Sequence, residues 1–319
     1  MISLPLPAGV ERQVVQTSRG PVPVLCGQPR EPQGVQIDVI MASGFFGTKE
    51  DFRELLSLLA AAGLRGWACD YAGQLDPDHG QDSYTIARMA GDLRELMHVV
   101  TGGRPAHVIG HCLGGFVARS AVLAEPGLAR SLTLLSCGPS MRERKHRAML
   151  SGLSQLHGKG GTMMLWPLVK SLLADDDTIM REFWHAKLAT MNPRWVTGTA
   201  QSLAAEPDRS AELAAAGLPV LLVHGKRDRR LWSPDAYADM ARRLGARHVV
   251  IERASHSANM EQPGLTAAAL LDFWAAAQPL TAQPLTGQPL TAQPPAARPL
   301  TAQPPAARPL AGQPVAAAR

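Results

Sequence analysis

Apolar runs of strand length alternate with helical stretches along this chain, and that alternation restricts the fold more than any other feature. The runs cover residues 35–41, 66–71, 106–110, 131–136, 219–224 and 248–251. Between them, residues 51–62 and 87–100 repeat apolar side chains every three to four positions, as one face of a helix does. Strands that alternate with helices pair in parallel beneath helical layers. The sequence therefore predicts an α/β fold with a mostly parallel sheet.

Three further segments complete the predicted organisation. Residues 10–17 and 21–25, separated by a short turn, predict an antiparallel hairpin leading into the sheet. Strand signals stop between residues 139 and 217, where the sequence becomes helical in character. We therefore expect a core in two parts, 1–139 and 218–276, interrupted by a helical cap at 140–217, called the cap segment below. From residue 279 a proline falls every fifth residue, so 277–319 is predicted to be an extended, disordered tail.

Composition and charge exclude several classes of function. The formal net charge is +5, but three of the positive charges are arginines of the proline-rich tail, which leaves +2 elsewhere, so no nucleic-acid partner is indicated. No apolar stretch reaches the roughly 18 residues of a membrane span, and no basic segment opens a signal peptide, which predicts a cytoplasmic protein. The four cysteines have no metal-binding spacing. We expect neither a disulfide, nor a metal, nor an organic cofactor.

A cysteine stands at the centre of a glycine-flanked turn. The strand at 106–110 runs directly into Gly110-His111-Cys112-Leu113-Gly114, after which a helix is expected. Glycines two residues either side of a nucleophile let a strand turn sharply into a helix and expose the side chain between them. The same pattern also occurs as an ordinary turn in α/β crossovers, so other residues must support the functional interpretation. With that support, Cys112 is the predicted nucleophile.

An acid and a histidine follow the cysteine in the order that a catalytic triad requires in this type of sheet. Asp228 comes just after the strand at 219–224, and His256 just after the strand at 248–251. The carboxyl ends of parallel strands meet at one edge of a sheet, so Cys112, Asp228 and His256 are expected together. Asp70 is an alternative orienting acid, but it precedes Cys112 and breaks the order.

These motifs together resemble the α/β-hydrolase superfamily. The resemblance rests on the Gly-x-Cys-x-Gly turn, on Gly225-x-x-Asp228, and on Ser255-His256 followed by Glu261-Gln262-Pro263, and it covers residues 10–276. Family members usually carry His-Gly-x-x-Gly after the third strand, where this chain has serine, glycine, two phenylalanines and glycine at 43–47. By this resemblance, the backbone amides of Phe45 and Leu113 form an oxyanion hole, each donor contributing roughly 3 kcal/mol.

The remaining histidines are assigned structural roles or none. His107 and His224 lie on predicted strands and are interpreted as packed side chains. His111 adjoins the nucleophile and is expected to point away from it. His157 and His185 lie in the cap segment and could line a pocket, although nothing in their spacing favours this.

A thiol nucleophile implies an acyl-thioester intermediate, which water, an amine or another thiol can resolve. We therefore predict hydrolysis or transfer of an acyl group from an ester or thioester, either free or bound to a carrier protein. Tryptophans and methionines of the cap segment are interpreted first as residues that pack its helices, and alternatively as the lining of a pocket for an apolar acyl group. The basic run at 142–147 is either a solvated helix face or a contact for a phosphate or an acidic carrier. The alternative function is a binding protein or non-hydrolytic isomerase that uses the same pocket.

Overall fold

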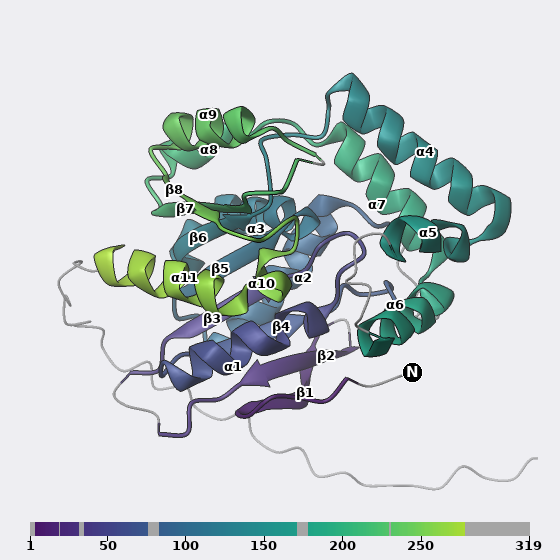
Figure 1. Cartoon of the computed structure of the whole chain (residues 1–319). Helices are drawn as coiled ribbons and strands as arrows, with labels where there is room; N and C mark the ends of the chain where they lie inside the picture. Colours follow the sequence, from purple (N-terminus) through teal and green to yellow (C-terminus); the bar gives the residue numbers. More distant parts are fainter. Residues whose placement is uncertain are drawn as a thin grey trace, which may run out of the picture. The chain divides into compact units, whose positions relative to one another are not determined.

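An eight-stranded sheet forms the centre of the protein (Figure 1). The computed structural model describes residues 4–18, 20–31, 35–75, 83–170, 178–229 and 231–277. The strand order is β1-β2-β4-β3-β5-β6-β7-β8. The strands are β1 (Val10–Thr17), β2 (Gly20–Gly27), β3 (Asp38–Ala42), β4 (Arg65–Cys69), β5 (Ala106–His111), β6 (Ala129–Leu135), β7 (Val220–Gly225) and β8 (Arg247–Ile251). β1 pairs with β2, and β2 with β4, in antiparallel orientation, whereas all other neighbouring strands are parallel, so the predicted mostly parallel sheet is confirmed.

Several strand boundaries differ from the predicted ones by one to three residues, and for the start of β3 and the end of β4 the reason can be identified. β3 begins at Asp38 instead of residue 35, because pairing with β4 starts where Asp38 lies opposite Arg65. The two side chains also form an ion pair at 2.6 Å. β4 ends at Cys69, two residues early, because the residues that follow it bond to loops beside the sheet. Asp70 accepts a hydrogen bond from the Lys49 amide, for example.

Helices cover both faces of the sheet. On one face lie η1 (Lys49–Phe52), α1 (Arg53–Ala61), α10 (Ala258–Glu261) and α11 (Pro263–Ala277), and on the other lie α2 (Ile86–Thr101), α3 (Leu113–Ala124), η2 (Pro126–Leu128) and α9 (Pro234–Leu244). Alternate residues of β3 supply the two cores: Val39 and Met41 pack towards α1 and α11, whereas Ile40 packs towards α2 and α3. Such strands, buried on both faces, read as the continuous apolar runs of the sequence.

The cap segment is helical where the structure describes it. Its elements are α4 (Arg144–Gly160), η3 (Thr162–Leu165), α5 (Trp166–Lys170), α6 (Thr178–Thr190), α7 (Pro193–Ala205) and α8 (Ser210–Ala215). Helix α4 packs on α7, and α6 packs on η3 and α5, whereas α8 packs on α9 and α3 of the core. No strand occurs at 140–170 or 178–217. The domain boundaries remain a prediction. From residue 278 onwards, the predicted tail lies outside the described residues.

Candidate active site

Cys112 occupies a strained turn between β5 and α3. Its backbone angles are φ 51° and ψ −111°, a region that residues with side chains rarely adopt. The turn is held by the Cys112 amide, which donates to the Leu135 carbonyl of β6 at 2.9 Å, and by the Gly115 amide, which donates to the Cys112 carbonyl at 3.0 Å. Strain of this kind costs about 1–3 kcal/mol and persists only where neighbours hold it. The result is a half-buried cysteine at the start of a helix.

The glycines around the turn are required by close backbone approach. A Cβ atom on Gly110 would lie 2.2 Å from the Gly114 carbonyl oxygen, and one on Gly114 would lie 2.1 Å from the Ala42 carbonyl oxygen. Gly225 has the same role beside the loop at 252–257, which contains His256 and is called the histidine loop below: a Cβ atom on Gly225 would lie 2.1 Å from the Ser255 carbonyl oxygen. The glycine spacing that the sequence displays therefore has a steric origin.

Asp228 and His256 form a hydrogen-bonded pair on adjacent loops after β7 and β8. Nδ1 of His256 lies 3.0 Å from Oδ2 of Asp228, and the Asp228 side chain is fully buried. The same carboxylate oxygen accepts a hydrogen bond from the Tyr237 hydroxyl at 3.2 Å. From the other side, Nε2 of His111 lies 2.9 Å from the His256 carbonyl oxygen. His111, expected to point away from the nucleophile, thus braces the backbone of the histidine loop.

The electrostatic environment of His256 favours its charged form. Burial alone lowers the pKa of His256, but the negative charge of Cys112 and hydrogen bonds with Asp228 and Cys112 outweigh it and raise this pKa to about 10. The other cysteines differ: burial raises the pKa of the Cys26 and Cys69 thiols to about 12 and that of Cys137 further still. Burial therefore keeps these three thiols protonated, whereas Cys112 lies where it interacts with the His256 side chain.

The loop at 43–47 brings a backbone amide, that of Phe45, close to Cys112. A Cβ atom on Gly44 would lie 3.5 Å from Cβ of Cys112, so the loop passes directly beside the turn. Leu113 is the first residue of α3, and the first amides of a helix have no acceptor within it. Within the described residues, neither the Phe45 amide nor the Leu113 amide has a hydrogen-bond acceptor. Both donors remain available to a ligand.

Several carbonyl groups of this loop are fixed by residues that the sequence did not identify. The Tyr71 hydroxyl donates to the Ser43 carbonyl at 2.8 Å, and Nε2 of Gln74 donates to the Gly47 carbonyl at 2.8 Å. The Gly47 amide closes the turn on the Gly44 carbonyl at 3.0 Å. These contacts supply the bracing where the family usually has a histidine in place of Ser43. Their only sequence signal is the position of residues 71 and 74 just after a strand.

Asp70, the alternative acid, is engaged elsewhere. Its carboxylate accepts hydrogen bonds from the Lys49 amide at 2.9 Å and from the Lys49 ammonium at 2.5 Å. It thus anchors the start of η1, and the acid bonded to His256 is Asp228.

The remaining histidines have other surroundings. His107 bonds a strand hydroxyl 2.8 Å away, and burial lowers its pKa to about 3, so it stays neutral. His224 lies 3.0 Å from the carbonyl oxygen of the next residue, and burial lowers its pKa as well. The His185 ring packs edge-on against the Trp166 ring, with the ring centres 5.1 Å apart. The side chain of His157 lies outside the described part of the structure.

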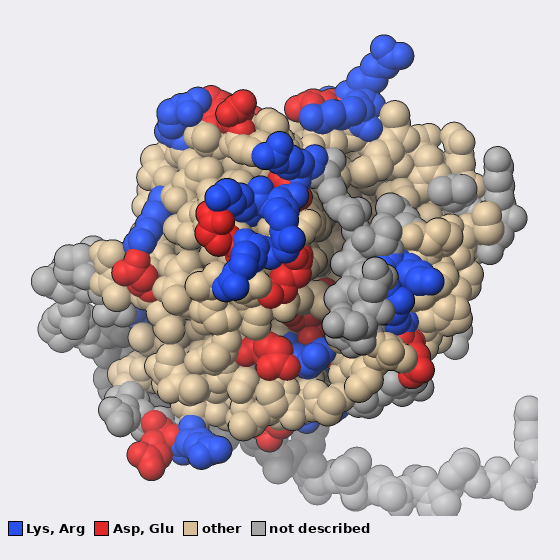
Figure 2. Space-filling model, viewed as in Figure 1, with Lys and Arg blue, Asp and Glu red and all other residues tan. Residues whose placement is uncertain are grey.

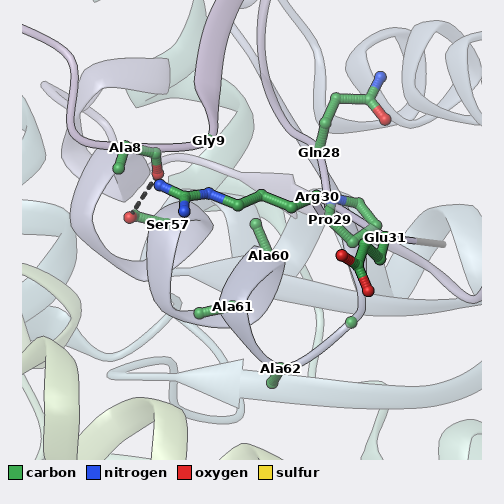
Figure 3. Close-up of a pocket in the computed structure, with 11 residues that line it drawn as sticks. Ala8, Gly9, Gln28, Pro29, Arg30, Glu31, Ser57, Ala60, Ala61 and Ala62 are labelled. Atoms are coloured by element: carbon green, nitrogen blue, oxygen red, sulfur yellow. Dashed lines mark hydrogen bonds between the residues drawn. The ribbon is translucent and has the colours of Figure 1, made fainter.

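A cavity of about 700 Å³ lies away from these residues (Figure 3). It is bounded by the end of α1 and by residues next to the β1–β2 hairpin, including Arg30 and Glu31, and the Ser57 hydroxyl donates to the Ala8 carbonyl at its wall. Because α1 ends there and β4 then begins, this cavity lies at the amino-terminal end of β4, opposite the edge that carries Cys112. We assign it no role in the chemistry.

The described residues offer no site for a metal ion and no membrane-spanning helix. No group of three or more histidine, cysteine or acidic side chains is arranged to hold a metal within this part of the chain. No helix of the described residues is long and apolar enough to cross a bilayer.

Comparison with known proteins identifies the family. The model of the α/β hydrolase family matches residues 39–269, so the chain belongs to this family. Among curated proteins, it is 29% identical over 202 residues to the dihydrolipoyllysine-residue acetyltransferase component of the acetoin cleaving system of Cupriavidus necator. That match covers 58% of this chain and 51% of the relative. The chain spans about half the length of the curated relatives it matches.

Solved structures show the same fold at low identity. A thermophilic esterase from Thermogutta terrifontis superposes with a TM-score of 0.69 at 20% identity, covering 84% of this chain and all of the esterase chain. The carboxylesterase CesB from Bacillus subtilis has a TM-score of 0.69 at 17% identity, covering 85% of this chain and 93% of that one. The α/β-hydrolase fold predicted from the sequence is therefore confirmed.

Proposed function

We propose that this α/β hydrolase acts on an acyl ester or thioester through a covalent acyl-thioester on Cys112. The observation that carries the proposal is the position of His256, whose side chain bonds Asp228 on one side and interacts with Cys112 on the other. Nucleophile, base and orienting acid in this relation are the requirement for nucleophilic acyl substitution.

The chemistry proceeds in two balanced steps. The Cys112 thiolate attacks the substrate carbonyl carbon, and the π electrons move to oxygen to form a tetrahedral oxyanion. As the carbonyl reforms, the bond to the leaving group breaks, and protonated His256 gives its Nε2 proton to the departing alkoxide or thiolate. Neutral His256 then takes a proton from water or another acceptor, which attacks the thioester and regenerates the thiolate. Asp228 holds the ring through Nδ1 in both steps.

The backbone amides of Phe45 and Leu113 are the proposed oxyanion donors. Both belong to segments beside Cys112, and both lack an acceptor within the described residues. Donors that are already oriented stabilise developing negative charge without reorganisation, at roughly 3 kcal/mol each. This arrangement favours acyl chemistry over mere binding, because a binding site has no need of unsatisfied donors beside a nucleophile.

The substrate is proposed to carry negative charge outside its acyl group, as a carrier-bound thioester would. Six exposed arginines have no acidic partner among the described residues: Arg142, Arg144, Arg147, Arg227, Arg229 and Arg253. Figure 2 shows basic side chains over the ends of β7 and β8 and over the start of α4. His146 Nε2 lies 2.6 Å from the Leu231 carbonyl oxygen, which brings the two arginine-rich segments together beside the Asp228 loop. The name of the Cupriavidus relative, an acetyltransferase component, also favours thioester chemistry.

Steady-state kinetics on p-nitrophenyl butyrate and butyryl-coenzyme A test the proposal. Cys112→Ala and His256→Ala are each expected to lose at least about a thousandfold in kcat/KM, because either change removes a partner of the same step. Cys26→Ala, a buried cysteine on β2, is the matched control and should retain activity. Full activity in Cys112→Ala would contradict the proposal, and tight binding of butyrate analogues without any turnover would favour a binding protein.

A further inference from the structure

A buried lysine reaches from the cap segment to the loop beside Cys112. Lys187 lies on α6, and its side chain is completely buried. The ammonium donates a hydrogen bond to the Phe46 carbonyl and lies 3.7 Å from the centre of the Trp184 ring. Lysine is almost never fully buried unless it is paired, because removing its charge from water is costly. A lysine kept in this position therefore calls for a specific role.

The charge of Lys187 is balanced by groups of the core instead of the cap segment. Burial lowers the pKa of Lys187, whereas Asp51, Asp70 and Glu50 raise it, and Lys49 opposes them. Asp51 is itself buried and fixed, since one of its carboxylate oxygens accepts a hydrogen bond from the backbone at the start of η1. These groups all belong to η1 or to the end of β4. Lys187 is thus an electrostatic connection from the cap segment to the core next to the loop.

The contact with Phe46 acts on the loop that contains a proposed oxyanion donor. The carbonyls at 43, 44 and 47 are bonded by groups of the core, whereas the carbonyl of Phe46 is bonded by Lys187. Phe45 lies one residue away, and its ring packs against Trp195 of α7 with the ring centres 5.2 Å apart. The peptide unit between Phe46 and Gly47, two units after the one that contains the Phe45 amide, is therefore held from the cap segment.

We propose that Lys187 is a positioning residue that orients the Phe45 amide by holding the Phe46 carbonyl, and that the cap segment thereby completes the oxyanion hole. This inference rests on the proposed function. Its physical basis is that an oxyanion donor is effective only within a narrow range of distance, and displacements of about 1 Å can cost on the order of a hundredfold in rate. Without the ammonium, the Phe46 peptide is free to rotate towards another partner.

Two reactions of the same thiol distinguish positioning from general destabilisation. Acylation of Cys112 by p-nitrophenyl butyrate passes through an oxyanion, whereas its alkylation by iodoacetamide does not. In Lys187→Met, acylation is expected to fall at least about tenfold while alkylation stays within about twofold. Lys170→Met, which changes an exposed lysine of the cap segment, is the matched control and should leave both rates unchanged.

A trifluoromethyl ketone of similar chain length gives an independent measurement, because its adduct with the thiolate is an oxyanion. Its inhibition constant is expected to rise at least about tenfold in Lys187→Met. If this variant does not fold, Lys187→Gln carries the same test, since it removes the charge with a smaller change in polarity. An unchanged ratio of acylation to alkylation in the folded variant overturns the inference. Failure of the proposed function is seen separately, as turnover that survives Cys112→Ala.

Discussion

Removal of the Cys112 thiol is predicted to lower the pKa of His256 by about three units. In the native protein that pKa is raised to about 10, against the effect of burial, and the largest contribution that raises it is the negative charge of Cys112. Two unit charges about 4 Å apart, at an effective dielectric constant of about 20, interact by roughly 4 kcal/mol. One pKa unit corresponds to about 1.4 kcal/mol, so the loss of this charge is worth about three units.

Cys112→Ala and Cys112→Ser separate charge from hydrogen bonding. Both variants lack the thiolate, and serine alone retains a hydroxyl beside the ring. If the charge is what raises the pKa of His256, this pKa falls to near 7 in both variants. The pKa is measured from the imidazole Cε1 proton by NMR, with His256→Gln to assign the signal. Cys26→Ala is the control and should leave the pKa near 10. A pKa near 10 in Cys112→Ala would refute the thiolate as its cause, as would a pKa near 6.5 in the native protein.

Three other outcomes follow from particular contacts. Maleimide at neutral pH should modify Cys112 alone in the native protein, because burial keeps the other three thiols protonated; mass mapping of a second modified cysteine would contradict this. Tyr237→Phe, which removes the hydroxyl that bonds Asp228, should cost about 1 kcal/mol of stability to urea and less than tenfold in turnover; no change in either would discount the contact. Gly110→Ala should destabilise the fold by about 1–3 kcal/mol or more. Gly91→Ala, in the middle of α2 with open space around it, should instead stabilise it by up to about 1 kcal/mol, and equal effects would refute the steric argument.

The fold could be predicted because its evidence is local. Strands buried on both faces leave continuous apolar runs, and the helices between them leave a three-to-four periodicity, so both are visible without knowledge of tertiary contacts. The ends of the strands were harder to predict from the sequence, since they depend on pairing partners that are distant in the chain. The start of β3 depends on where Arg65 lies opposite Asp38, which no local pattern displays.

In the candidate site, too, some residues could be predicted from local sequence and others could not. Cys112, Asp228 and His256 each follow a recognisable strand, and parallel topology brings strand ends to one edge, so their proximity followed from chain order. Lys187 and Tyr71 carry no such signal. A lysine on a helix is ordinarily a solvated residue, and only the packing of α6 against the core reveals that this one is buried. The residues that the sequence concealed are thus those proposed to position the reacting groups.

The most direct test of the central claim is the mass of the intact protein within seconds of mixing with p-nitrophenyl butyrate, followed by peptide mapping. The account predicts an added butyryl group on Cys112 in the native protein, absent in Cys112→Ala and persistent in His256→Ala if acylation is forced with excess ester. Addition of an amine or thiol should shorten the lifetime of the adduct. A butyryl group on any other residue, or turnover without an adduct dependent on Cys112, would contradict the account.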